Sequence, residues 1–396
     1  MTGGLSDRVD PLMIESTSFT TSNDRPGAEH GAEPTEMLLN MGPQHPSTHG
    51  VFRMVLWVDG EKIVDMEPHI GYLHRGSEKL CEGEQYHQVI TLFDRMDYIA
   101  NFNNELVYCM AVEQLMGLEV PQRAEYVRVI LCELNRIASH LLFVAAMGLD
   151  AGAITPSMFC FRGRERIQDL FEAVSGARMM HNYLRVGGLK EDLPDGFSKM
   201  VTTLLPLLRE DVEESDKLLT FNEIFLARLK DVGVISPEDA LDYGLTGPCL
   251  RACGIDYDLR KAEPYSVYER FDFDVPVGLD GDSWDRHYVR VQEMYQSLSI
   301  VEQAVAQMPE GSVRSSLGRK VIRPPAGEIY VRAENPRGEI GVYLVSDGSD
   351  RPYRIKVRPP SFCNLSAIKH LLRGAWIADA VVILGSLDIV LGEVDR

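Results

Sequence analysis

The feature of this 396-residue chain that most constrains its fold is an apolar stripe at helical spacing. Within residues 121–150, hydrophobic side chains recur at steps of three and four, which places them on one face of an α-helix. They are Val127, Ile130, Leu131, Leu134, Ile137, Ala138, Leu141 and Leu142. Pro121 suits the first turn of such a helix. A long helix with an apolar face has to pack against others, so the stripe predicts a helical bundle.

The helical pattern continues from Ser77 to about Met308. Further helices are predicted over 78–117, 160–183, 197–227 and 286–308. The stretch 229–285 is dotted with Gly and Pro and predicts irregular structure.

Two short β elements flank the helices. Val51–Trp57 and Lys62–Glu67 favour strands around Asp59-Gly60, a dipeptide typical of a tight hairpin turn. Glu328–Ala333 and Ile340–Val345 alternate around Pro336-Arg337-Gly338 like a second hairpin.

A short helix near 364–373 and an apolar stretch, 375–391, are expected after the second hairpin. The predicted fold class is α+β and mostly α, a long-helix bundle with an N-terminal β-hairpin region and a small C-terminal β element. The expected parts are a tail (1–36), a β region (37–72), the helical core (73–310) and a C-terminal α/β segment packed on the bundle (311–396).

The charge balance narrows the classes of function. The formal net charge is −19, so nucleic-acid phosphates would be repelled and non-specific binding to them is not expected. The composition, 45% hydrophobic and 25% charged, is ordinary for a folded protein. The acidic excess fits either a solubilising surface or a specific partner.

No segment predicts a membrane crossing or secretion. The apolar run Leu141–Leu149 is short, and Ala375–Leu391 is interrupted by Asp379 and Asp388, whereas a span needs about 20 apolar residues. Residues 1–36 lack the basic start and apolar stretch of a secretory signal and predict a flexible tail.

The seven cysteines are scattered, which fits reduced thiols better than a disulfide framework: Cys81, Cys109, Cys132, Cys160, Cys249, Cys253 and Cys363. Only Cys249 and Cys253 are close together. A single C-x3-C is weak support for a metal site, so structural thiols are the preferred interpretation.

His45 and His49 stand four residues apart, the spacing of two zinc ligands on one helix face. The glycines and prolines of Met41–Gly50 exclude a helix there, so the zinc interpretation fails and a loop is predicted. The two histidines either lie on the surface or reach from this loop into a cleft.

Three other segments carry candidate residues. Asp94-Arg95-Met96-Asp97-Tyr98 lies near the start of a helical segment and is either an exposed charged turn or a functional one. Asp150 follows the uncharged stretch Ile137–Leu149 and is either a solvated helix end or a buried functional acid. Residues 74–79 predict a helix start, with a glycine and a serine before a charged first turn. Local physics alone decides none of them.

Six motifs taken together resemble the 49-kDa subunit family of respiratory complex I. They are MGPQHPSTHGVFR, GYLHRGSEKL, FDRMDY, GDSWDRHYVRVQEM, GEIGVYLVSDGSDRPYR and the terminal LGSLDIVLGEVDR. The resemblance spans about residues 37–396. It implies a peripheral-arm subunit of a proton-translocating NADH (or other donor):quinone oxidoreductase, with a fold like that of nickel–iron hydrogenase large subunits.

The hydrogenase relation gives a test, because those proteins hold their metal centre with two C-x2-C pairs. In this chain the first pair would fall at about Asp97 and Ala100, and the second at about Val390 and Glu393. None of the four is a cysteine, and these side chains cannot replace soft thiolates around nickel and iron. The resemblance therefore implies that hydrogenase chemistry is lost and that the cavity binds quinone, with no metal in this chain.

The resemblance assigns the pocket residues. It implies that His49 and Tyr98 flank the quinone head-group and that Asp150 partners the histidine. Arg75 and Arg95 match arginines near an iron–sulfur cluster that an adjacent small subunit holds. Some members have a histidine after Arg-Met in Gly176-Ala177-Arg178-Met179, where this chain has Met180 followed by His181. Whether His181 replaces it stays open.

The resemblance also implies partners: the small cluster-bearing subunit, a homologue of the C-type subunit of the peripheral arm, and the membrane-arm subunits. It places the chain on the cytoplasmic face of the membrane as a peripheral part. The electron donor and the quinone type stay open. The alternatives are a hydrogenase large subunit, which nickel analysis would reveal, and a non-catalytic scaffold, which would tolerate loss of His49 or Tyr98.

Overall fold

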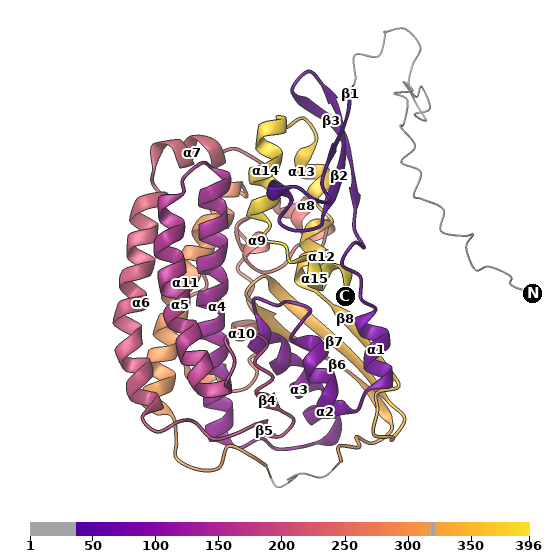
Figure 1. Cartoon of the computed structure of the whole chain (residues 1–396), viewed down its shortest axis with the longest axis vertical. Coiled ribbons are helices and arrows are strands. Elements are labelled where there is room, and N and C mark those ends of the chain that lie inside the picture. Colours follow the sequence, from indigo (N-terminus) through magenta and orange to yellow (C-terminus); the bar gives the residue numbers. More distant parts are fainter. Residues whose placement is uncertain (1–36, 316, 318–320) are drawn as a thin grey trace, which may run out of the picture.

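The computed structural model describes residues 37–315, 317 and 321–396, so the tail expected over 1–36 lies outside the described residues. Four long helices lie side by side on one flank of the molecule (Figure 1). They are α4 (Gln122–Asp150), α5 (Thr155–Ser175), α6 (Phe197–Leu219) and α11 (Ser283–Gln307). The predicted helical bundle is confirmed.

Helix α4 is the central member of this bundle. It packs against α5, α11, α3 (Asn101–Met116) and α14 (Ile377–Ser386). Burial is therefore not limited to the predicted apolar stripe: Glu133, Arg136 and His140 of α4 are also fully buried. A helix surrounded on all sides needs polar partners for such groups: Glu133 pairs with Arg136, and His140 with Glu293.

Helix α4 is the one described helix that is long and apolar enough to cross a membrane by length and composition. Its most apolar window is 89% buried inside the protein, as expected for the core helix of a bundle. In the sequence, charged residues such as Glu133 and Arg136 divide this helix into shorter apolar runs, so a search for one long apolar run does not find it.

The N-terminal sheet is antiparallel in the order β1-β2-β3, with β1 (Met37–Met41), β2 (Arg53–Asp59) and β3 (Lys62–His69). Asp59 pairs with Lys62 across the turn at Gly60, so the predicted hairpin is confirmed. Strand β1 was not predicted. It pairs with β2 from Met37↔Val58 to Met41↔Met54 and leads directly into the histidine loop.

The C-terminal sheet has the order β6-β7-β8, with β6 (Gly327–Asn335), β7 (Gly338–Ser346) and β8 (Arg354–Arg358). The second predicted hairpin is confirmed, with Asn335 and Gly338 paired on either side of its turn. Strand β8 was not predicted. Helix α3 packs on β6 and β7, which brings the turn residue Arg337 into the interior.

The remaining elements are short. They are η1 (Pro46–Thr48), α1 (Ser77–Gly83), α2 (Tyr86–Phe93), β4 (Leu184–Arg185), β5 (Gly188–Leu189), α7 (Glu223–Leu229), α8 (Pro237–Asp242), α9 (Pro248–Arg251), α10 (Leu259–Ala262), η2 (Tyr268–Arg270), α12 (Pro360–Leu365), α13 (Ile368–Leu372) and α15 (Leu391–Asp395).

Three helix predictions were wrong in extent, and one of them, over 197–227, is the two helices α6 and α7. The helix predicted over 78–117 is three helices, broken at residues 84–85 and again at residues 94–100, where the chain turns and buries Asp94 and Asp97. The helix predicted over 160–183 begins at Thr155 and ends at Ser175, because the following Gly176 has a positive φ of 81°. A mostly helical α+β fold is confirmed.

A second hydrophobic core, separate from the one that includes the helical bundle, positions the site. It joins Phe52, Met54 and Leu56 of the N-terminal sheet region to C-terminal side chains such as Leu384 and Leu391. This packing brings the end of the chain beside the histidine loop, as the purple and yellow ribbons show (Figure 1).

Candidate functional site

His49 lies at the end of a tight loop that its own polar groups hold. The Oγ1 of Thr48 donates to the carbonyl oxygens of His45 and Gly50, and His45 and Gly50 form an isolated β-bridge. His49 itself has a left-handed backbone, with φ at 52°. Strain of this kind persists only where the surroundings fix it. The loop therefore holds the His49 ring in one direction, toward the bundle.

The His49 ring meets Asp150, the last residue of α4. The distance from His49 Nε2 to Asp150 Oδ2 is 2.8 Å, and the two side chains are 19% and 13% exposed. Asp150 is thus a partly buried acid with a partner, not a solvated helix end. The other ring nitrogen, Nδ1, makes no hydrogen bond with the described residues and remains available to a ligand.

Charge decides the protonation of His49. Burial alone lowers the pKa of the imidazole, but the hydrogen bond and charge of Asp150, together with the charge of Asp388, outweigh burial and raise it above 6.5. Sequence reasoning missed Asp388 as a site residue and noted it only as a charge that interrupts an apolar run. His49 can therefore carry a proton near neutral pH.

Tyr98 lies on the turn between α2 and α3. Its side chain is half-buried, and its hydroxyl makes no hydrogen bond with the described residues. Burial raises the pKa of Tyr98, and the nearby Asp97 and Glu393 carboxyls raise it further against the effect of Arg337. The phenol is therefore protonated at neutral pH and free to donate.

The interpretation of residues 94–98 as an exposed charged turn is wrong for its acids. Asp94 and Asp97 are fully buried, and only Arg95 is well exposed. Arg337 donates from Nη1 to Asp97 Oδ2 at 2.8 Å and from Nη2 to Asp388 Oδ1 at 3.3 Å. One buried guanidinium thus links the Tyr98 turn to the carboxylate that acts on His49.

The C-terminal segment packs against both expected head-group residues. A Cβ added at Gly385 would lie 2.7 Å from Asp150 Oδ2 and 3.2 Å from His49 Nε2. A Cβ added at Gly392 would lie 3.1 Å from a ring carbon of Tyr98. His49 and Tyr98 therefore both border residues 385–392, and glycine is required where the segment passes each of them.

The two predicted arginines lie on the surface, unlike the other predicted site residues. Arg75 and Arg95 are both exposed, and neither forms an ion pair with a described carboxylate. Arg95 donates from Nη1 to the carbonyl of Thr91 at 2.6 Å. Two guanidinium groups are thus available to a partner on the surface, and their distance from a cluster stays a prediction.

His181 does not occupy a position exposed to a partner. Its ring stacks on Phe102, with centroids 4.2 Å apart, and it is 4% exposed. Burial lowers its pKa to about 4, so it is neutral. Met180 instead receives a hydrogen bond from Asn101 at its sulfur, at 3.5 Å. His181 is a core residue in this structure.

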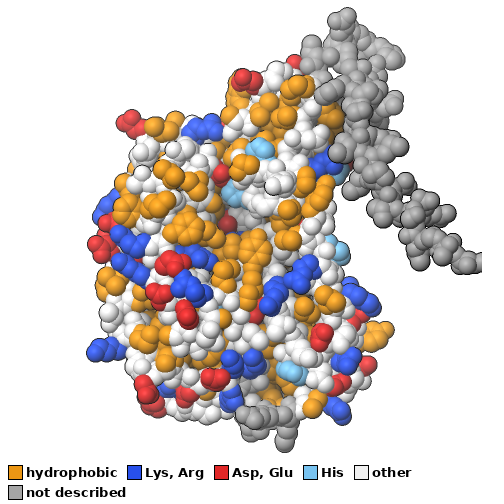
Figure 2. Space-filling model, in the orientation of Figure 1, with side chains coloured by type: hydrophobic (Ala, Val, Ile, Leu, Met, Phe, Trp, Pro, Cys, Tyr) orange, Lys and Arg blue, Asp and Glu red, His pale blue; other side chains and the backbone are white. Residues whose placement is uncertain are grey.

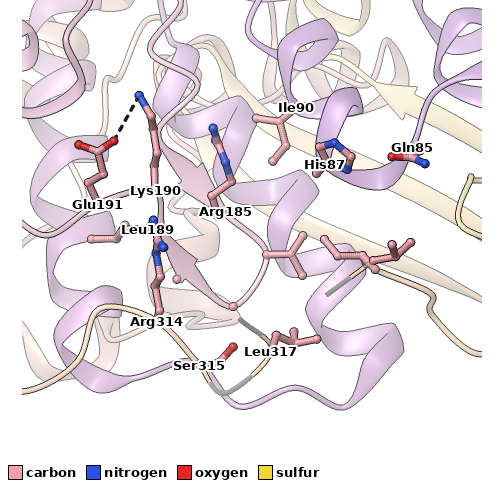
Figure 3. A pocket seen from close by; sticks show the side chains of 15 residues that line it. Gln85, His87, Ile90, Arg185, Leu189, Lys190, Glu191, Arg314, Ser315 and Leu317 are labelled. Atoms are coloured by element: carbon pink, nitrogen blue, oxygen red, sulfur yellow. Dashed lines mark hydrogen bonds and ion pairs between the residues drawn. The ribbon is translucent and has the colours of Figure 1, made fainter. Parts of the chain in front are cut away.

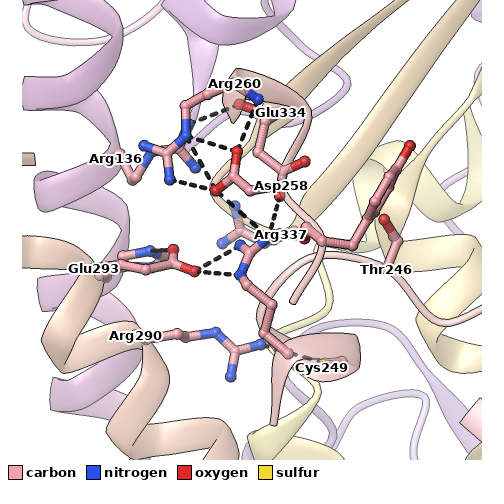
Figure 4. A network of polar contacts seen from close by, with 12 residues as sticks. Arg136, Thr246, Cys249, Asp258, Arg260, Arg290, Glu293, Glu334 and Arg337 are labelled. Atoms are coloured by element: carbon pink, nitrogen blue, oxygen red, sulfur yellow. Dashed lines mark hydrogen bonds and ion pairs between the residues drawn. The ribbon is translucent and has the colours of Figure 1, made fainter. Parts of the chain in front are cut away.

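Buried charges beneath the site pair with one another (Figure 4). Arg251 donates to Glu293 at 2.6 Å and to Glu334 at 2.9 Å, and Arg260 donates to Asp258 at 2.7 Å. Each charge has an opposite partner, which is the condition for keeping ions out of water. These residues connect the bundle to the C-terminal sheet.

A separate cavity of about 410 Å³ contains none of the predicted site residues. Arg185, Lys190 and Arg314 line it together with His87 (Figure 3), and Lys190 pairs with Glu191. Its basic lining suits an anion better than a quinone head-group. The candidate site is therefore assigned to His49 on the chemistry of its side chains and not on the volume of a cavity.

Apolar side chains border the approach to Asp150. Leu149, Ile154 and Met158 are 49%, 63% and 62% exposed at the corner where α4 meets α5. Figure 2 shows apolar side chains spread over the upper part of one face, with histidine atoms among them. Such a border suits an apolar ligand or a partner.

The thiols do not form a metal site in the described part of the chain, where no cluster of three or more His, Cys, Asp or Glu side chains has metal-binding geometry. Cys249 and Cys253 are buried, and the Cys253 thiol donates to the Cys249 carbonyl at 3.3 Å. Burial raises the pKa of Cys253 to about 12. Both act as core side chains.

Comparison with known proteins agrees with the motifs. Residues 150–396 match the family model of the 49-kDa subunit of respiratory-chain NADH dehydrogenase. The chain is 55% identical over 361 residues to the D-type subunit of NADH-quinone oxidoreductase from Bacillus cereus, an alignment that covers 91% of this chain and 98% of the relative. It is 52% identical over 362 residues to a D-type subunit of the same enzyme from Solibacter usitatus, with the same coverage. The chain therefore belongs to the family of the 49-kDa subunit of respiratory-chain NADH dehydrogenase, a multi-subunit oxidoreductase.

Proposed function

We propose that this chain forms the quinone-reduction pocket of a proton-translocating NADH (or other donor):quinone oxidoreductase. The observation that carries the proposal is that His49 and Tyr98 both pack against residues 385–392, while His49 Nδ1 and the Tyr98 hydroxyl make no hydrogen bond with the described residues. Two donors that reach one head-group can hold the two carbonyl oxygens of a quinone. Apolar side chains at the nearby α4–α5 corner suit its tail.

Reduction of a quinone to a quinol takes two electrons and two protons. Tyr98 donates its phenolic proton to one oxygen, and its raised pKa means that this proton is present at neutral pH. His49 donates from Nδ1 to the other oxygen, since a charged imidazole has a proton on both ring nitrogens. General acids placed at both oxygens remove the need to build up negative charge there.

Asp150 and Asp388 set the charge of His49. When His49 gives up its proton, Asp150 loses the positive charge that it faces, whereas Asp388 keeps its bond to Arg337. The negative charge of Asp150 then has no partner, so Asp150 can move or take up another proton. This charge imbalance couples quinone reduction to proton pumping in the membrane arm.

The electrons come from a partner. In the described residues no thiolate set is available for an iron–sulfur cluster, and a cluster in the adjacent small subunit supplies the electrons. The exposed guanidinium groups of Arg75 and Arg95 lie toward that subunit and favour the reduced cluster through their positive charge.

The expected relation to nickel–iron hydrogenases accounts for the residues at this site. The positions expected for the two cysteine pairs lie close together. Gly392 packs against the carbonyl of Met96, and the Asp97 carboxyl acts electrostatically on that of Glu393. With Asp97, Ala100, Val390 and Glu393 in place of thiolates, the site is unable to hold nickel and iron and is left to an organic acceptor.

The other partners in the proposal are the homologue of the C-type subunit and the membrane-arm subunits, with the chain peripheral on the cytoplasmic face of the membrane. The quinone then enters from the membrane side. The electron donor, NADH or another carrier, is decided by other subunits.

The test is Tyr98→Phe in the assembled complex, with His49→Ala beside it. Loss of either donor is expected to lower quinone reductase activity about 100-fold, while the partner's cluster is still reduced by the donor. Tyr353→Phe, which removes an exposed hydroxyl, serves as the matched control. Unchanged activity of Tyr98→Phe would refute the donor role.

A further inference from the structure

A second buried acid lies close to Tyr98. Glu393 belongs to α15, directly after the glycine that packs on the Tyr98 ring, and it is 1% exposed. Its Oε1 accepts a hydrogen bond from the backbone N–H of Ser361 at 2.9 Å. Its Oε2 is buried and has no hydrogen-bond partner in the described part of the chain. An ionised carboxylate is not expected to leave one oxygen unsolvated in this way.

Burial and the charge of Asp97 favour a neutral Glu393, against the charge of Arg337. Asp97 faces it from the α2–α3 turn, and Arg337 faces it from the β6–β7 turn. Arg337 donates hydrogen bonds to Asp97, Asp388 and Ser139 and none to Glu393. A buried carboxyl beside a carboxylate, with no cation bonded to it, keeps its proton.

Proton affinities set the direction of transfer. Burial, followed by the charge of Asp97, raises the pKa of Glu393 to about 8. Burial raises the pKa of the Tyr98 phenol above 10. A Tyr98 phenolate is therefore a stronger base than the Glu393 carboxylate, and at pH 7 Glu393 has a proton to give.

We propose that Glu393 is a buried carboxylic acid that restores the proton of Tyr98 after Tyr98 has protonated the quinone. The O–H bond of Glu393 breaks, the O–H bond of Tyr98 forms, directly or through one water molecule, and the negative charge moves from the phenolate to Glu393. No electron moves in this step. Glu393 then takes a proton from water that enters as the quinol leaves. The inference rests on the proposed donor role of Tyr98.

The groups that act on Glu393 come from three elements besides its own. They are Asp97 and Tyr98 of the α2–α3 turn, Arg337 of the β6–β7 turn and Cys363 of α12. Burial raises the pKa values of Tyr98 and Cys363, and that of Arg337 is raised by its acidic partners. Burial also raises the pKa of Asp97, but Asp97 has the guanidinium bond, which favours its ionised form, so of the two carboxyls Glu393 is the one expected to keep its proton to higher pH.

The experiment uses Glu393→Gln in the assembled complex, because Gln keeps the bond to Ser361 and has no proton to give. Quinone reductase activity of the wild type is expected to fall as pH rises through about 8. The variant is expected to be about tenfold slower at pH 7, to lose this fall and to keep its KM. Glu393→Asp is expected to recover part of the rate.

Infrared spectroscopy supplies a readout that a structural role would not change. A protonated carboxyl gives a carbonyl band that the ionised form lacks, and the band of Glu393 is expected at pH 7, absent in Glu393→Gln and shifted in Glu393→Asp. Glu105→Gln is the matched control. Glu105 is also fully buried with a raised pKa, so its variant loses a different band and keeps the rate and its pH dependence.

The outcomes separate the two proposals. If Tyr98→Phe is slow but Glu393→Gln keeps the wild-type rate and pH profile, the inference is wrong and the pocket stands. If Tyr98→Phe is as fast as the wild type, the donor role itself falls. The inference is overturned, whatever the kinetics, if the wild type at pH 7 has no carbonyl band that shifts in Glu393→Asp. This comparison does not need Glu393→Gln to assemble.

Discussion

At the scale of residues, the site depends on how burial and charge balance at His49. The imidazole loses water on burial, which favours its neutral form, but Asp150 and Asp388 favour the charged form and prevail. Its charged form therefore also binds the histidine loop to the end of α4, and this contribution has a defined pH dependence.

Asp150→Asn tests that balance. The pKa of His49 is raised above 6.5, so its contribution to loop stability is complete below pH 6.5 and is lost as pH rises through the raised value. The variant is expected to lose about 1 kcal/mol of loop protection at pH 6, roughly a fivefold faster amide exchange. Hydrogen–deuterium exchange of residues 45–50 across pH measures it. Exchange that is identical in both proteins at every pH would contradict the expected balance.

Local patterns were unable to find these residues. A lone histidine in a Gly/Pro loop and a lone aspartate at a helix end each had a bland alternative, and only the resemblance of whole motifs paired His49 with Asp150 before the structure did. Asp388 and Arg337 gave a weaker signal still. A charge that interrupts an apolar run and an arginine in a hairpin turn become informative only when folding brings them together.

At the scale of elements, the two hairpins and the long helices follow from local pattern because each satisfies its own period and turn chemistry. The break in the helix predicted over 78–117 does not. Residues 94–100 turn because Asp94, Asp97 and Asn101 find buried partners, and tertiary contacts such as the bond from Arg337 to Asp97 override helix propensity there.

Helix α14 gives the prediction at this scale. A methyl group at Gly385 would collide with Asp150 Oδ2 and crowd His49 Nε2, so Gly385→Ala is expected to separate the pair while the helix persists. Overpacking of this kind costs about 1–3 kcal/mol. Quinone reductase activity of the assembled complex is expected to fall about tenfold, because a displaced His49 no longer reaches the head-group.

Gly83→Ala is the matched control for this substitution, since a Cβ at Gly83 meets nothing within 4 Å. Thermal unfolding of both variants separates loss of stability from loss of function. If Gly385→Ala is fully active, close packing at this point has no part in the site.

At the scale of the whole molecule, the site joins parts of the chain that are far apart in sequence. His49, Tyr98, Asp150, Arg337 and Asp388 come together because the C-terminal segment returns between the histidine loop and the bundle. These contacts join residues that are far apart in sequence, so local sequence patterns predict the helices and strands but not how they pack around the site. The division into parts at 37–72, 73–310 and 311–396 stays a prediction.

The most direct measurement of the central claim is a structure of the assembled complex with a quinone or a head-group inhibitor bound. We expect density for the head-group between His49 and Tyr98, with its two oxygens about 3 Å from Nδ1 and from the phenolic oxygen. A head-group bound elsewhere, for example in the basic cavity beside Arg185, or a histidine loop too far from Tyr98 for both to touch one ring, would contradict the claim.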